Sequence, residues 1–159
     1  MENSIKSTLE HKELVKDLMG IIIDDLVLRS IHHDDSKLKE PEKTLFDEYS
    51  SKLKDCTYGS PEYKEFLKGL KPALDHHYAV NSHHPEHYPN GIEDMDLVDL
   101  IELICDWTAS SRRHNDGNIF KSIEINKDRF HLSEQICSIL KNTVERYLLR
   151  GTVEETLNG

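Results

Sequence analysis

The spacing of apolar side chains along this chain is typical of amphipathic α-helices. Residues 5–29 carry apolar side chains at three- and four-residue steps, which predicts a long first helix. A shorter helix is predicted over residues 31–38. Pro41 is expected to open the next helix, because proline suits the first helical position.

The helical pattern continues in the second half of the chain. Residues 61–84 predict another long helix, in which Pro72 should kink or restart the helix. Asp94 is the expected N-cap of a strongly apolar helix. Ser133 is the expected N-cap of the last helix, which the pattern carries to about residue 149.

The segment 112–132 is the least periodic part of the chain. It is polar and contains the turn signal Asn115-Asp116-Gly117, so we expect a loop or a short hairpin there. No internal repeat, low-complexity segment or long linker divides the sequence. We therefore predict an all-α fold, a single domain over residues 1–159 built as a helical bundle of about five to seven helices.

The charge of the chain excludes some partners. The 159 residues include 20 basic and 30 acidic side chains, a net charge of −10 with neutral histidines. Duplex nucleic acid and anionic membranes select basic surfaces, so we expect neither as a partner. A small phosphorylated substrate needs only a local basic cluster and stays open, as does assembly into a homo-oligomer.

Cysteine use and the amino-terminal sequence point to the cytoplasm. The three cysteines are far apart and form no CxxC pair, which argues against disulfides and thiolate zinc sites. Met1-Glu2-Asn3-Ser4 is polar and no long apolar run follows it. No segment has the ~20 apolar residues of a membrane span. We expect a protein of the reducing cytoplasm.

Histidine is the unusual residue in this composition, with ten copies. Eight of them lie in clusters close to acidic residues, and imidazole and carboxylate groups together can ligate transition metals. The run His33-Asp34-Asp35-Ser36-Lys37 places such a pair one helical turn ahead of a lysine that could neutralise phosphate charge. An exposed polar turn is the alternative for this run.

Three further features extend this pattern. Five histidines fall within residues 76–87, where a helical face runs into a proline turn. Asp106 lies inside an apolar helical segment, where a buried acid needs a partner or a metal. His11 shares a face with Val15 and Leu18 of the first helix. A satisfied core histidine at position 11 and a helix-surface acid at position 106 are the alternatives.

Taken in order along the chain, these motifs resemble those of the HD-domain superfamily of metal-dependent phosphohydrolases. The residues that carry the resemblance include His11, His33-Asp34 and Asp106, and the likeness spans about residues 5–110. The sequence is also similar to a smaller, uncharacterised HD-like family of bacteriophages and bacteria. A phage-encoded protein would act in the host cytoplasm.

The resemblance implies a site for one or two divalent transition metals: Mn, Fe, Ni, Co or Zn. The implied ligands are His11, His33, Asp34 and Asp106 for the first ion, and Asp34, as a bridge, with His77, His83 and His84 for the second. We prefer His77 to His76 because it continues the apolar stripe of its helix. Neighbouring helical residues point about 100° apart, so His83 and His84 can share a site only if the helix ends there, as Pro85 allows.

Charged residues around this set are candidates for phosphate binding and proton transfer. Arginine makes bidentate pairs with phosphate oxygens, and a lysine ammonium offers only donors. The candidate phosphate-binding residues are Arg29, Lys37, Arg112 and Arg113, and the candidate catalytic residues are Lys37, Asp35 and Glu86. Ordinary salt bridges to the many carboxylates are the alternative for each arginine.

The leading hypothesis is a metal-dependent phosphohydrolase that cleaves a nucleotide or related phosphoester with metal-activated water. One alternative is a non-enzymatic protein on the same scaffold that binds a host factor or sequesters a ligand. Another is a di-iron redox enzyme, because histidine-rich ligation without cysteine permits iron. Metal content, an absorption spectrum and phosphate release distinguish the three.

Overall fold

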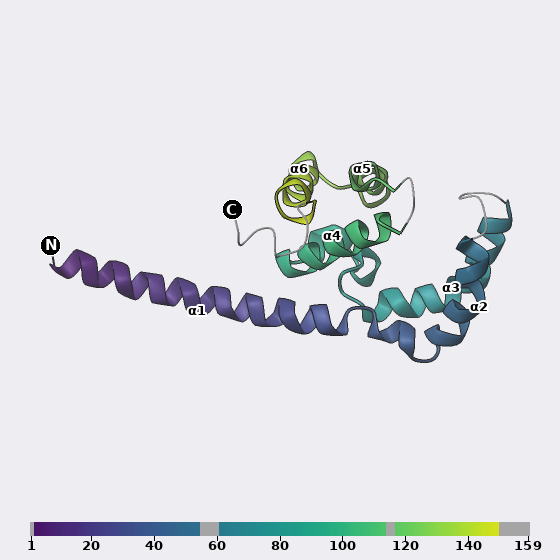
Figure 1. Ribbon diagram of the computed structural model, residues 1–159, viewed down its shortest axis with the longest axis horizontal. Helices are drawn as coiled ribbons and strands as arrows, with labels where there is room; N and C mark the ends of the chain where they lie inside the picture. The colour runs from purple at the N-terminus through teal and green to yellow at the C-terminus, as the bar shows by residue number, and fades with distance from the viewer. Residues whose placement is uncertain (1, 55–60, 114–116, 150–159) are drawn as a thin grey trace. The chain divides into compact units, whose positions relative to one another are not determined.

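The computed structural model describes residues 2–54, 61–113 and 117–149. These residues form six α-helices, with short 3₁₀- and π-helical turns between or after them, and contain no strand (Figure 1). The predicted all-α class and the expected number of helices are confirmed. The chain divides into two compact units, Met1–His33 and Asp34–Gly159, and each is described by itself. That the chain is a single domain stays a prediction.

The first unit consists of one long helix. α1 (Glu2–His32) is an uninterrupted α-helix, drawn in purple in Figure 1. The prediction of a helix over residues 5–29 is confirmed, and the helix extends beyond both ends of that range. Its last turn contains Arg29 and His32, and basic side chains at this end complement the helix dipole.

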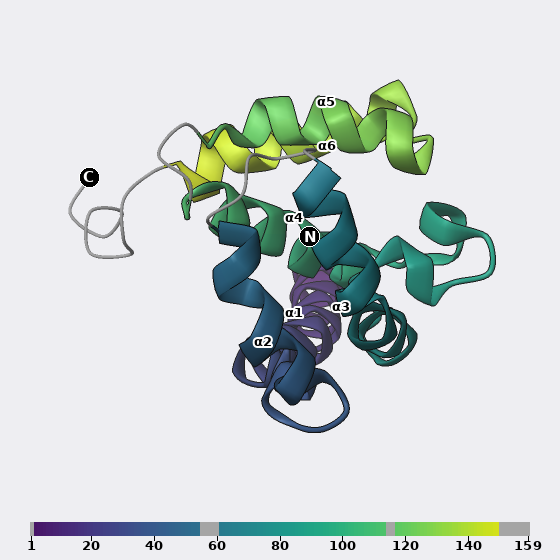
Figure 2. The ribbon, with the colours of Figure 1, turned by 90° about the vertical axis from the view of Figure 1, so that its right-hand side faces the viewer.

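The second unit begins with a tight turn and two packed helices. The 3₁₀ turn η1 (Asp35–Leu38) precedes α2 (Glu42–Lys54) and α3 (Pro61–Val80), which lie side by side (Figures 1 and 2). A Cβ added at Gly69 would lie 2.5 Å from the ring of Tyr49, so glycine allows the close approach of the two helices. A helix is present close to the predicted position, but it begins at Glu42, so Pro41 precedes α2 and is not its first residue.

The structure of α3 narrows one part of its prediction and corrects another. The helix continues through Pro72 to Val80, so this proline does not restart it, and the alternative of a kink at Pro72 stays a prediction. The helix also ends four residues before the predicted end at position 84. The chain then turns through two short 3₁₀ segments, η2 (Pro85–His87) and η3 (Gly91–Asp94), before the next helix.

The N-cap of α4 (Leu97–Ser111) is Asp96, so the prediction of Asp94 is wrong. The Asp96 carboxylate accepts hydrogen bonds from the backbone N–H groups of Val98 and Asp99. The Asp99 carboxylate accepts from the N–H of Asp96, which completes a capping box. Asp94 instead accepts from the backbone and side chain of Asn90 and closes the preceding turn.

The prediction of a loop or hairpin over residues 112–132 is also wrong, because α5 (Ile119–Phe130) lies within this range. Asn118 caps the helix by accepting from the N–H of Lys121 at 3.1 Å. Ile119 and Ile123, one helical turn apart, are both buried and anchor the helix. The apolar periodicity of α5 is weak in the sequence because most of the other residues in this short helix are polar.

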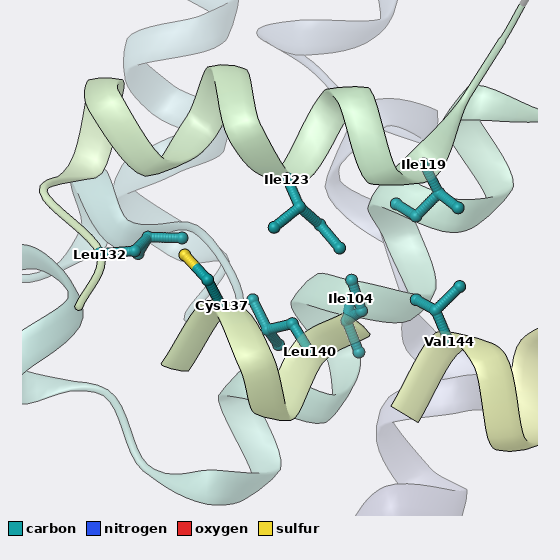
Figure 3. Packing of buried hydrophobic residues seen from close by; sticks show 7 residues of the cluster. All are labelled: Ile104, Ile119, Ile123, Leu132, Cys137, Leu140 and Val144. Atoms are coloured by element: carbon teal, nitrogen blue, oxygen red, sulfur yellow. The ribbon is translucent and has the colours of Figure 1, made fainter. Parts of the chain in front are cut away.

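The last helix follows its prediction. Ser133 caps α6 (Glu134–Thr143), and the helix continues as the π-helical turn η4 (Val144–Leu148). α6 lies beside α5, and side chains of α4, α5, α6 and the connections between them converge in an apolar core (Figure 3). The buried members of this core are Ile104, Ile119, Ile123, Leu132, Cys137, Leu140 and Val144. None of the described helices combines the length and the apolarity needed to cross a membrane.

Candidate metal centre

Four side chains of the second unit bring potential metal-ligating atoms together. Asp34, His77, His83 and His84 each offer one donor atom, and these atoms all lie within 4.8 Å of one another. Donors that each lie about 2.0–2.2 Å from one ion are themselves about 3–4 Å apart. The group could therefore hold a metal ion with small adjustments of its side chains.

Asp34 connects the histidines to a lysine. One carboxylate oxygen, Oδ1, lies 3.2 Å from Nε2 of His77 and 3.6 Å from Nε2 of His83. The other oxygen, Oδ2, accepts a hydrogen bond from Nζ of Lys37 at 2.6 Å. The backbone of Asp34 is left-handed, with φ 60°, a conformation that aspartate tolerates better than most residues. Such uncommon conformations cluster at functional sites.

The three imidazole rings are in close contact. Nε2 of His77 lies 2.9 Å from Nε2 of His84, and the ring centroids of His83 and His84 are 4.1 Å apart. A proton on one of the two Nε2 atoms makes this contact a hydrogen bond. The same separation suits two nitrogens that ligate one ion.

His84 is neutral at pH 7. Burial lowers its pKa from 6.5 to about 3, and the neighbouring His83 and His77 act in the same direction. The negative charges of Asp106 and Asp34 oppose this shift without cancelling it. The neutral imidazole is the form that ligates metals, so metal binding to His84 near neutral pH would release no proton.

The local fold explains why these histidines converge. His77 lies one helical turn after the buried Ala73 on α3, so it points to the interior, whereas the side chain of His76 is 40% exposed. His83 and His84 follow the end of α3 and are no longer held at helical angles. The expectation that the helix must end before both can reach one site agrees with this geometry.

The sequence interpretation missed a buried carboxylate. Glu42 is fully buried and lies 2.9 Å from Nδ1 of His77 and 2.7 Å from Nδ1 of His76. A signal was present, because Glu42 precedes Leu45, Phe46 and Tyr49 at the spacing of one helix face. An acid on the apolar face of a helix indicates a buried partner.

Two acids of α4 were also missed. The buried carboxylate of Asp99 accepts from Ser82 Oγ at 2.8 Å and from Tyr88 Oη at 2.6 Å, which ties the loop around His83 to α4. Burial and this carboxylate raise the pKa of Tyr88 to about 12. Oε1 of Glu102 lies 3.1 Å from Nδ1 of His83. Asp99, Glu102 and Asp106 recur at steps of three and four residues, which places them on one helix face.

The other predicted metal ligands have different positions. Asp106 is half-buried on α4, and its charge acts on His84. His11 lies on α1, and His33 directly follows this helix; both belong to the first unit. Their assignment as ligands of a first ion, together with Asp34 and Asp106, stays a prediction.

The predicted phosphate-binding and catalytic residues are spread over the chain. Lys37 is at the cluster through Asp34, and its Nζ lies 5.4 Å from the ring centroid of Phe46. Asp35 is half-buried at the start of η1. Glu86 is paired with Arg129 at 2.6 Å.

The three predicted arginines lie at helix ends. Arg29 pairs with Asp25 of α1 at 2.8 Å. Arg112 and Arg113 are exposed at the carboxyl end of α4, and the guanidinium of Arg112 donates to the carbonyl of Leu148. Of the predicted phosphate-binding residues in the second unit, the structure therefore brings Lys37 into contact with the cluster.

Comparison with known proteins identifies a family. No curated protein and no solved structure gives a match to this chain. Residues 1–146 match a family of unknown function, DUF5662, and this range includes all four donors of the cluster. The match covers most of the sequence. The chain therefore belongs to the DUF5662 family.

Proposed function

We propose that the protein is a metal-dependent phosphohydrolase that acts on a nucleotide or a related phosphoester. The observation that carries the proposal is the convergence of three imidazoles and one carboxylate, from Asp34, His77, His83 and His84, on one point of the second unit. The resemblance of the motifs to those of the HD-domain superfamily supports the reaction class.

The donor set fits a divalent transition metal. Imidazole nitrogens suit Mn, Fe, Co, Ni and Zn, whereas Mg and Ca prefer sites made of oxygen ligands. His77 and His83 are buried, which keeps bulk water from competing for their nitrogens. When bound, such an ion polarises phosphoryl oxygens and lowers the pKa of water at the site.

The protein's own residues have separate roles in this proposal. Asp34 uses one oxygen toward the histidines and the other toward Lys37. Lys37 offers only hydrogen-bond donors, so it stabilises negative charge on a phosphoryl group next to the cluster. Because Glu86 is engaged with Arg129, Asp35 is the better candidate for proton transfer.

The remaining predicted residues complete the proposal. The resemblance implies His11, His33 and Asp106, with Asp34, as the ligands of the first ion, and the four-donor cluster would then hold the second. Arg29, Arg112 and Arg113 are the further phosphate contacts. The ligand assignments depend on the resemblance, whereas the arginines are proposed from their positions at helix ends and from the bidentate pairs that arginine makes with phosphate oxygens.

The test combines metal analysis with a substrate screen. Untagged protein purified without chelator is analysed for transition metals and incubated with nucleoside monophosphates, triphosphates and cyclic nucleotides while phosphate release is followed. Asp34→Asn is the matched control, because asparagine keeps the size of the side chain and also tolerates a left-handed backbone.

We expect metal and phosphate release in the wild type and neither in Asp34→Asn. Metal without phosphate release from any substrate would contradict the hydrolase and favour a binding protein. Iron with a redox-sensitive absorption spectrum would favour the di-iron alternative.

A further inference from the structure

We infer that Glu42 and Glu102 are positioning residues that hold His77 and His83 as Nε2 ligands. Each glutamate accepts a hydrogen bond from the Nδ1–H group of one ring and so leaves the Nε2 lone pair of that ring directed toward Asp34. The inference rests on the proposed metal centre and adds two residues that lie outside its ligand set.

The contacts of the two histidines are alike. Nδ1 of His77 lies 2.9 Å from Oε2 of Glu42, and Nδ1 of His83 lies 3.1 Å from Oε1 of Glu102. On the opposite side of each ring, Nε2 lies 3.2 Å and 3.6 Å, respectively, from Oδ1 of Asp34. The glutamates come from different helices, α2 and α4, so the same arrangement is built twice from separate parts of the second unit.

The hydrogen bonds around Glu42 favour a proton on Nδ1 of His77. A carboxylate is an acceptor only, and a contact of 2.9 Å between two acceptors is repulsive. The hydroxyl of Ser36 donates to Oε2 of Glu42 at 3.0 Å and accepts from Nδ2 of Asn81 at 2.9 Å. The second N–H of Asn81 donates to the carbonyl of His77 at 2.8 Å. Nδ1 of His77 also lies 3.1 Å from Oγ of Ser36 and 3.0 Å from Nδ2 of Asn81. Both of these groups have oxygen acceptors for their protons, so with the His77 proton on Nδ1 every donor in this group has an acceptor.

His76 fits the same network. Its Nδ1 lies 2.7 Å from Oε1, the second oxygen of Glu42. Adjacent histidines on a helix point in different directions, so His76 and His77 reach the two oxygens of one carboxylate from neighbouring positions. The pair of histidines in the sequence is thus explained without a metal-ligating role for His76.

The complete burial of Glu42 requires such partners. Its side chain has 0% exposure, and a carboxylate removed from water is stable only with several hydrogen bonds or charges around it. Glu102 is also largely buried, with 13% of its side chain exposed. Outer carboxylates of this kind fix the tautomer of metal-ligating histidines and raise the basicity of the ligating nitrogen.

The assignment has a consequence for the centre of the cluster. With both protons on Nδ1, the lone pairs of His77 Nε2 and His83 Nε2 face the same carboxylate oxygen of Asp34. Three electron-rich atoms then point to one region, and a cation is the ligand that this arrangement stabilises. The arrangement should therefore bind a divalent cation rather than an anion.

The first test measures tautomers in wild-type protein loaded with Zn²⁺. Without a cation the two Nε2 lone pairs would face Oδ1 of Asp34 at 3.2 and 3.6 Å, contacts between acceptors that a proton on Nε2 would relieve. Long-range ¹H–¹⁵N spectra at neutral pH distinguish Nδ1–H from Nε2–H rings, and assignment comes from His77→Gln and His83→Gln. We expect both rings as Nδ1–H. Finding either ring as Nε2–H would overturn the inference for that histidine. No variant of a glutamate is needed, so a folding defect cannot obscure this result.

The second test uses Glu42→Gln and Glu102→Gln with Co²⁺ as the probe. An amide can accept or donate, so each variant should loosen the tautomer of its own histidine and leave the other ring as Nδ1–H. Each variant therefore controls for the other. We expect Co²⁺ affinity to fall about 10–100-fold in each variant, as for outer partners of metal ligands.

Unchanged Co²⁺ affinity and unchanged tautomers in folded variants would overturn the inference. A merely structural role would lower the melting temperature without changing one specific ring. Glu124→Gln, which breaks a surface pair with Lys141, serves as the control for a glutamate outside the cluster. These readouts do not involve phosphate release, so they succeed or fail independently of the proposed hydrolase activity.

Discussion

The two buried regions of the second unit have opposite chemistry. Between α4, α5 and α6 the buried side chains are apolar, among them Ile104, Ile123 and Leu140 (Figure 3). Around α2, α3 and the loop that follows, the fully buried residues include Glu42 and His77. The side chains are equally well buried in both regions, but only the burial of apolar side chains is favourable by itself.

The difference separates side chains that stabilise the fold by burial alone from side chains that need partners to be buried. Each buried apolar side chain contributes about 1.5–3 kcal/mol through the hydrophobic effect. Buried carboxylates and imidazoles lose their hydration, and only hydrogen bonds or opposite charges from their partners compensate for this loss. Buried groups of this kind are consistent with the metal centre proposed above. The two regions should therefore respond differently to mutation and to metal.

The largest effect on stability is expected in the apolar region. Ile123→Ala removes a fully buried side chain and should lower the free energy of unfolding by about 2–5 kcal/mol, because a cavity is left. Ile125→Ala, on the exposed side of the same helix, should change it by less than about 0.5 kcal/mol. Urea unfolding measures both. Equal effects at the two positions would contradict the packing of α5.

The metal should stabilise the polar region by a similar amount. A metal present at 100–1,000 times its dissociation constant adds about 3–4 kcal/mol to the free energy of unfolding. Chelator should therefore lower the melting temperature of the wild type and leave that of Asp34→Asn unchanged. A wild-type melting temperature that is indifferent to chelator and to added Mn²⁺, Co²⁺ or Zn²⁺ would argue against the site.

Lys37 should affect turnover and leave metal binding intact. Lys37→Ala removes a charge donor next to the cluster and should raise the activation barrier by about 2–4 kcal/mol. Metal content should stay at the wild-type level, because an ammonium cannot ligate a cation. Phosphate release and metal analysis on the same samples test this. Wild-type turnover in Lys37→Ala would show that Lys37 has no role in catalysis and only pairs with Asp34.

The smallest effect concerns pH. The pKa of His84 is lowered to about 3 in the folded metal-free protein, against 6.5 in the unfolded chain. As pH falls below about 6.5 the unfolded chain takes up this proton first, so stability present above that pH is lost progressively toward pH 3. Between pH 6.5 and 5 the loss is about 1–2 kcal/mol. Urea unfolding of His84→Asn should show a correspondingly weaker pH dependence; an identical dependence would contradict the assignment.

The sequence predicted most of the fold because helical periodicity is a local property. It failed where polar residues interrupt the pattern, as in α5, and where two aspartates compete for one cap, as at Asp94 and Asp96. The residue that decides such a cap is the one whose carboxylate meets the first backbone N–H groups. That contact depends on the path of the preceding turn, which the periodicity does not describe.

The candidate site was also predicted only in part from the sequence. The convergence of His77, His83 and His84 on Asp34 agrees with the grouping inferred from the sequence. The carboxylates behind the rings were missed, because Glu42 is separated by more than thirty positions from the histidines it contacts. Such contacts arise from tertiary packing, and the sequence offers only an indirect signal, an acid on an apolar helix face.

Metal content is the most direct test of the central claim, that Asp34 and the three histidines form a transition-metal site. Untagged wild-type protein and Asp34→Asn are purified without chelator, reconstituted with Mn²⁺, Co²⁺ or Zn²⁺, and analysed by mass spectrometry of the elements after removal of free ions. The account predicts at least one bound ion per wild-type chain and a loss of that ion in Asp34→Asn. Wild-type protein that retains none of these metals, or an Asp34→Asn variant that retains as much as the wild type, would contradict it.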